Sequence, residues 1–167
     1  MRLGRSLLTI CILTIISIIG GSVGSAVSDS GSKVDYPEGY RQWNHVKSMV
    51  IQPGHPLENP FQGIHHVYAN DKANHGLKSG RFEDGSVLVF DLLKYQKQGS
   101  ALVESDRKLV GIMQKDSNRF RSTGGWGFEG FGGNSKTKRL TTDGGKSCFQ
   151  CHTSQDKHDF VFTQPRK

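Results

Sequence analysis

Apolar and polar residues alternate along several short segments of the chain, as expected of β-strands that bury one face. The clearest strand covers residues 86–95 and follows a turn at residues 83–85. In another, the alternation places Ile64, His66 and Tyr68 on one face. The predicted strands are residues 47–51, 64–69, 86–95, 108–114 and 125–131.

Short helices are predicted between these strands. Pro37 suits the first position of a helix over residues 36–43. A second helix is predicted over residues 71–78, with Gly80 as its C-terminal stop. The pattern therefore predicts one mainly β (α+β) domain over residues 36–167, built from an antiparallel sheet and short helices.

The start of the chain has the layout of a secretory signal peptide. Two arginines precede an apolar run over residues 7–19, and small residues follow it up to Ala26. The run is shorter than the roughly 18 residues that span a bilayer, so we expect no stable membrane insertion. We predict a signal peptide over residues 1–26, a flexible leader over residues 27–35 and a periplasmic protein.

The charge of the chain is mildly basic and evenly spread. Removal of the signal peptide lowers the net charge from +7 to +5, since two arginines are lost. The longest basic stretch, residues 136–140, is too short to indicate nucleic acid, so none is expected as a partner.

Two cysteines and a histidine lie within five residues near the end of the chain, at Cys148, Cys151 and His152. A redox disulfide of the thioredoxin type would follow a strand early in a βαβ unit, which does not match this position. A zinc site would use these three residues and His158. The missing spacer between Cys151 and His152 would strain a tetrahedral site.

Covalent attachment of haem fits this cluster better than a redox pair or zinc. Cys-x-x-Cys-His is the attachment signature of c-type haem. The spacing allows Cys148 and Cys151 to bond the two vinyl groups of one porphyrin, and His152 to bind the iron as proximal ligand. The predicted export agrees with this chemistry, so we expect one haem c.

No residue stands out as a second iron ligand from its spacing. An open or weakly filled distal position is therefore the expectation. The candidates for a sixth ligand are His45, His55, His65, His66, His75, Met49 and Met113.

The order of several motifs in the chain resembles the cytochrome P-460 superfamily. The resemblance covers residues 36–162 and joins a mainly β domain to one C-terminal Cys-x-x-Cys-His. It implies a five-stranded antiparallel sheet, often a homodimer, and one haem per chain. The matching blocks are YPEGYRQW, FQGIHHVYAN, SGRFEDGSVLVFDLL, QKDSNRF, GGWGFEGF, SCFQCH and DFVFT.

Within this superfamily, the chain is more similar to the cytochrome c′-beta branch than to the hydroxylamine oxidases. The oxidases carry a lysine cross-link to the haem, and Phe90 stands where that lysine would lie. Lys78 and Lys94 are out of register with it. The c′-beta branch implies an apolar distal face that binds nitric oxide or carbon monoxide, with Phe90 as a cap. An ordinary core role also fits Phe90.

Two other functions are compatible with a haem domain of this kind. The first is an oxidoreductase that oxidises hydroxylamine or reduces peroxide, with Glu129, His65 or His66 as the acid or base. The second is an electron carrier for a partner cytochrome, with Met113 or a histidine at the sixth position.

Overall fold

The structure is a computed structural model that describes residues 33–165. The predicted signal peptide and residues 27–32 of the predicted leader lie outside this range. Val34, at the end of the predicted leader, is buried and packs in the core. Among the described residues, no helix is long and apolar enough to cross a membrane.

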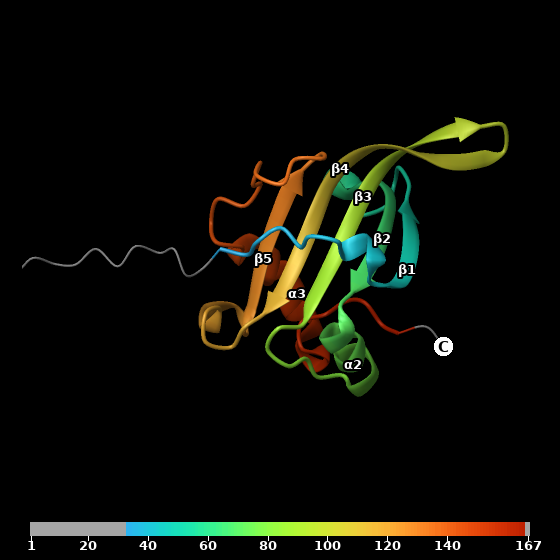
Figure 1. Ribbon diagram of the computed structural model, residues 1–167. Coiled ribbons are helices and arrows are strands. Elements are labelled where there is room, and N and C mark those ends of the chain that lie inside the picture. Colours follow the sequence, from blue (N-terminus) through green and yellow to red (C-terminus); the bar gives the residue numbers. More distant parts are fainter. Residues whose placement is uncertain (1–32, 166–167) are drawn as a thin grey trace, which may run out of the picture.

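Five antiparallel strands form one sheet in sequence order, β1-β2-β3-β4-β5 (Figure 1). This confirms the predicted mainly β fold with five strands. The β3–β4 hairpin is longer than predicted, and its tip extends beyond the rest of the sheet in Figure 1. The strands are β1 (Asn44–Ile51), β2 (Gly63–Ala69), β3 (Val87–Gln98), β4 (Ala101–Lys115) and β5 (Trp126–Gly132).

The helices are short and lie in the connections and at the C-terminal end. Helix α2 forms where predicted, with the Asn70 side chain accepting a 2.9 Å hydrogen bond from the Ala73 amide. Of the short helix predicted over residues 36–43, only a 3-10 turn at Tyr40–Gln42 forms, because Gly39 before it adopts a left-handed conformation (φ 70°). The helices are η1 (Tyr40–Gln42), α1 (Glu58–Phe61), α2 (Asp71–Ser79), η2 (Arg121–Thr123), α3 (Lys146–His152) and η3 (Thr153–His158).

The two faces of the sheet are covered by different parts of the chain. We call the side toward α3 the α3 face; Val67, Phe90, Gly111 and Gly130 lie side by side on it. The opposite side, the N-terminal face, is covered by the segment that precedes β1, which crosses in front of the sheet in Figure 1. The predicted alternation in β2 is confirmed. Ile64, His66 and Tyr68 pair with Leu93, Asp91 and Val89 and share the N-terminal face.

A buried carboxylate joins the N-terminal segment to the sheet. Asp91 on β3 is 1% exposed and accepts a 2.7 Å hydrogen bond from the Tyr40 hydroxyl. Arg107 on β4 forms a 2.6 Å ion pair with Asp91, and Arg41 forms another at 3.1 Å. Burial raises the pKa of Tyr40 and the nearby carboxylate raises it further, so the hydroxyl remains a donor. Burial also raises the pKa of Asp91, against the effect of the Tyr40 and Arg41 hydrogen bonds.

Replacing Asp91 with alanine is expected to destabilise the domain strongly. The change leaves the Arg107 guanidinium and the Tyr40 hydroxyl without their buried acceptor, at a cost of about 3–5 kcal/mol. Asp106→Ala is the control, because the Lys94–Asp106 pair (3.4 Å) is solvent-exposed. It should cost less than about 1 kcal/mol. Urea unfolding of both variants measures the difference, and equal losses would contradict a structural role for the Asp91 cluster.

Candidate functional site

Helix α3 carries the three residues of the predicted cluster. Its start is fixed by Asp143, whose side chain accepts hydrogen bonds of 2.9 Å from the backbone amides of Gly145 and Ser147. The helix then packs against β5 through contacts of Phe149 with Phe128. Cys148, Cys151 and His152 are thus brought together on one short helix beside the sheet.

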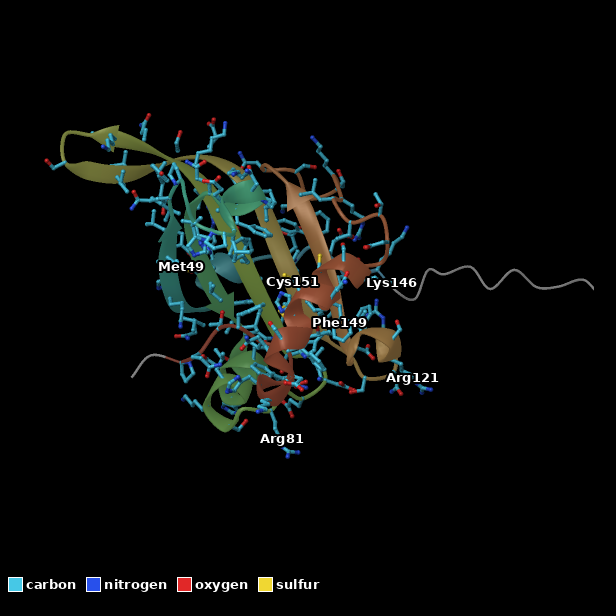
Figure 2. The ribbon with its side chains drawn as sticks, turned by 180° about the vertical axis from the view of Figure 1, so that it is seen from behind. Met49, Arg81, Arg121, Lys146, Phe149 and Cys151 are labelled. Carbon is cyan, nitrogen blue, oxygen red and sulfur yellow. The ribbon has the colours of Figure 1, made fainter. Side chains whose placement is uncertain are left out.

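The two thiols of α3 are free and differ in exposure. Cys148 is half-buried and packs against the core of the α3 face, and this burial raises the pKa of its thiol. Cys151 is exposed. Figure 2 looks onto the α3 face, with the helix in front of the sheet and Cys151 labelled. Three residues apart on a helix, the two thiols lie on neighbouring positions of one turn.

His152 is held in one orientation by three neighbours. Its Nδ1 lies 2.7 Å from the carbonyl oxygen of Phe160, and its ring lies 4.9 Å from the rings of Phe128 and Phe162. A carbonyl only accepts hydrogen bonds, so Nδ1 carries the proton and Nε2 keeps its lone pair. Burial lowers the pKa of His152, against the effect of the Phe160 hydrogen bond. This is the arrangement of a histidine prepared to bind a metal through Nε2.

The sheet beside α3 exposes apolar surface that no other element fully covers. Met49 is 49% exposed and Leu140 is 44% exposed. At Gly111 and Gly130, an added Cβ would meet no atom closer than 3.4 Å, so no packed side chain requires a glycine there. Figure 2 shows Met49 on the strand at the far side of this surface from Lys146. The half-buried residues of the same surface are Val67, Phe90, Leu109, Gly111 and Met113.

Phe90 lies in the middle of β3 on the α3 face. Its ring makes edge contacts with Phe61, at a centroid distance of 5.8 Å, and with His65, at 4.5 Å. Phe90 is only half-buried, whereas its neighbours Val89 and Asp91 on the N-terminal face are fully buried. An aromatic cluster of Phe61, His65 and Phe90 therefore lies at the edge of the exposed apolar surface.

His65 is the one predicted histidine that is deeply buried. It is 2% exposed, and its Nε2 has no hydrogen-bond partner. Burial, together with the neighbouring His66 and His55, lowers the pKa of His65 to about 4. The imidazole is therefore neutral at pH 7, with an unpartnered nitrogen beside Phe90.

Two proposed acids or bases lie on the N-terminal face, away from α3. His66 forms hydrogen bonds with Glu104 and Ser48. Glu129 is buried, and its carboxylate accepts hydrogen bonds from Arg139 and Thr141, which hold its pKa below the usual value against the effect of burial. Both side chains are engaged in these hydrogen bonds and lie on the side of the sheet opposite α3.

The other predicted ligands are scattered over the fold. Met49 and Met113 lie on the α3 face, while His45 contacts His66 and Tyr68 on the opposite side. His55 lies in an exposed loop, and His75 lies exposed on α2. Lys78 is also exposed on α2, and Lys94 pairs with Asp106.

The structure disfavours the zinc alternative for the cluster. Across residues 33–165, no three His, Cys, Asp or Glu side chains gather into a metal site, so His158 does not complete one with α3. Sequence reasoning missed the residues that frame His152 and Phe90. Phe61 and Phe128 approach them from distant segments, while Phe160 and Phe162 follow His152 after a turn, and only the aromatic content of these stretches signalled a role.

The residues present fit a haem. Free thiols one helical turn apart, an imidazole with a free Nε2 and a broad apolar surface beside them are what a covalently held porphyrin requires. Cys148, Cys151 and His152 would hold it, and the α3 face would cover one side of the ring.

Comparison with known proteins agrees with this geometry. A family model described as Cytochrome P460 matches residues 37–163, most of the chain. No curated protein matches the chain. The matched range includes the whole sheet and helix α3, so the fold and the cluster are parts of one family pattern. The chain belongs to the cytochrome P460 family, and the family implies a haem cofactor with its iron.

Proposed function

We propose that this protein is an exported c-type cytochrome with one covalently attached haem, which binds small diatomic gases such as nitric oxide and carbon monoxide. The observation that carries the proposal is the pairing of His152 and Phe90. One is oriented to bind iron, and the other borders the apolar surface beside it. Bound haem supplies an iron atom with a position for an external ligand.

On the proximal side, the chain's own residues attach and orient the group. The Cys148 and Cys151 thiols would each form a thioether with a vinyl group. His152 would bind through Nε2, because Nδ1 donates to the Phe160 carbonyl. The Phe128 and Phe162 rings hold the imidazole in place.

On the distal side, the aromatic residues would select the ligand. Phe90 and Phe61 have no hydrogen-bond donor, and His65 is neutral and buried. An apolar environment raises the cost of bringing in anions or strongly polar molecules, while a neutral diatomic gas loses little on entry. The apolar surroundings of Phe90 support gas binding, and Phe90 itself would contact the haem.

One observation favours a second candidate, an oxidoreductase acting on hydroxylamine or peroxide. The Nε2 atom of His65 has no partner, so it would be available to exchange a proton with a substrate. Phe90 stands where the hydroxylamine oxidases would carry their cross-linking lysine, while Lys78 is exposed on α2 and Lys94 is exposed on β3, where it pairs with Asp106. Electron transfer through Met113 is less favoured, because this half-buried side chain packs against the core cluster of the α3 face.

We also propose a location, an oligomeric state and a redox partner for the protein. The N-terminal residues support a signal peptide and a periplasmic location. The resemblance to the superfamily supports a homodimer. A partner cytochrome would supply electrons to the iron or remove them from it.

Loss of both thiols is expected to abolish covalent attachment. Cys148→Ser with Cys151→Ser leaves no sulfur to bond the vinyl groups, so denaturing electrophoresis should show no haem on the chain. Ser147→Ala is the control, and it should keep the haem. The intact mass of the unaltered mature protein should equal the polypeptide plus one haem. Haem that stays attached in the double variant, or a haem peptide that includes Lys78 or Lys94, contradicts the proposed attachment.

Removal of the Phe90 ring should speed gas binding. Phe90→Ala relieves steric hindrance on the distal side, so stopped-flow measurements should show faster carbon monoxide binding to the ferrous protein. Phe120→Ala is the matched control, since Phe120 is buried in the core on the N-terminal face of the sheet. It should lose about 3–5 kcal/mol of stability with unchanged rates. If Phe90→Ala also loses stability without a change in rate, Phe90 is an ordinary core residue.

The depressed pKa of His65 predicts a loss of stability in acid. Its pKa falls from 6.5 in the unfolded chain to about 4 in the folded protein, so the unfolded state binds more protons between these values. The free energy of unfolding should decrease by up to about 3 kcal/mol as the pH falls from 6.5 to 4, with no contribution above 6.5. His65→Leu should remove this part of the slope in urea unfolding, and His75→Gln should not. If the pH dependence of stability between pH 4 and 6.5 is unchanged in His65→Leu, it does not come from His65.

A further inference from the structure

We propose that Lys115 and Asp159 form a positioning pair that sets the strength of His152 as an iron ligand through the Phe160 carbonyl. The inference rests on the proposed function, because it assumes that His152 binds the haem iron. It concerns residues that neither touch the iron nor lie on α3.

The carbonyl that accepts from His152 belongs to an unusual turn. Asp159 and Phe160 both adopt left-handed conformations, with φ of 51° and 64°, and neither is a glycine. Such backbone is unfavourable for residues with a side chain, so the surrounding structure must stabilise it. The turn follows η3 and reverses the chain, which brings the Phe160 carbonyl within 2.7 Å of the His152 Nδ1.

The Asp159 carboxylate anchors this turn to the sheet. Its Oδ1 accepts hydrogen bonds from the Lys115 Nζ, at 2.6 Å, and from the Trp126 indole, at 3.3 Å. Its Oδ2 accepts a 3.2 Å hydrogen bond from the Phe82 amide. Donors from β4, β5 and the loop after α2 therefore converge on one side chain, next to the residue whose carbonyl holds His152.

The Lys115 side chain is buried and points to the Asp159 carboxylate, not to solvent. It is 8% exposed at the end of β4, and its Nζ also donates to the Gly124 carbonyl at 3.2 Å. The ammonium lies 5.1 Å from the Trp126 ring, a cation–π contact. A buried lysine requires a charged partner, and Asp159 is the one it has in the described structure.

Packing around the turn adds to the same constraint. The Phe160 ring contacts Phe149 on α3 at 5.0 Å, and it lies so close to Gly124 that a Cβ there would come within 2.4 Å of it. Two residues further on, the Phe162 ring contacts His152 at 4.9 Å. The anchored turn thus delivers both the carbonyl and one of the two rings that orient the imidazole.

The effect on the iron follows from the hydrogen bond. A donor bond from Nδ1–H to a fixed carbonyl increases the electron density of the imidazole and makes Nε2 a stronger ligand. If the turn relaxes, this bond lengthens and the iron–histidine bond weakens. Ligand basicity is one of the protein's controls of haem potential, so a weaker ligand also raises the reduction potential.

The test compares Asp159→Asn and Lys115→Met with the unaltered holoprotein. Asparagine keeps the size of the side chain but loses the charge and the second acceptor, and methionine keeps most of the lysine volume. Resonance Raman spectra of the ferrous protein should show the iron–histidine stretch shifted to lower frequency in both variants, and electrochemical titration should show higher potentials. Lys115→Arg should shift the stretch and the potential less than Lys115→Met does, because arginine keeps the positive charge.

Asp91→Asn is the matched control. It also neutralises a buried carboxylate held by cations, but on the N-terminal face. It should lower the melting temperature while leaving the iron–histidine stretch unchanged. A shift in Asp91→Asn equal to that of Asp159→Asn would mean that general loosening explains the effect, and it would overturn the proposal.

Two further outcomes separate the inference from the function on which it rests. If Lys115→Met does not fold, Asp159→Asn decides, because it keeps a side chain of the same shape. A normal stretch in a folded Asp159→Asn protein overturns the inference and leaves haem binding intact. The absence of an iron–histidine stretch from the unaltered protein would instead overturn the assignment of His152, and the inference with it.

Discussion

The central constraint on this fold is that a five-stranded sheet has two faces to bury and a short chain to bury them with. The N-terminal face is closed by the chain's own residues, through Val34, Tyr40 and the ion pairs of Asp91. The α3 face is closed around Phe128, where α3 and α2 pack, and around the buried pair of His65 and Leu92. Its middle exposes apolar side chains beside α3. The haem that the family implies is a flat, largely apolar group, and it would extend the core on this face of the sheet.

Strand β3 links the two faces. Asp91 and Phe90 are adjacent, so their side chains point to opposite sides of the sheet. Asp91 is fixed by three partners from η1 and β4, and this leaves little freedom for the backbone under Phe90. The proposed distal cap thus stands on the most strongly anchored part of the sheet. A rigid support is what selection between small ligands by steric fit requires.

The sequence predicted what depends on local pattern and missed what depends on distant contacts. Alternation located the strands, and the spacing of Cys148, Cys151 and His152 within one helix identified the cluster. The helix predicted at residues 36–43 is shorter than expected because one residue, Gly39, takes a left-handed conformation. His66 and Glu129 were candidates because chemistry alone cannot assign a face, whereas the register of the sheet turns both away from α3. The hydrogen bond from His152 to the Phe160 carbonyl could not be predicted, since every residue has a backbone carbonyl and the residue type does not show which one will accept.

The two sides of the site are built from different kinds of structure, and this division explains how one family can hold different chemistries. The proximal side depends on backbone geometry, a helix followed by a left-handed turn anchored by Asp159. A substitution of Asp159 is therefore expected to disturb the surroundings of His152. The distal side depends on side chains that stand on strands, such as Phe90 and His65. A strand tolerates an exchange of phenylalanine for lysine at one half-buried position without a change of register. If the proposed function holds, ligand choice would change at β3 while haem attachment stays the same, and the residue at position 90 would carry more information about function than the fold does.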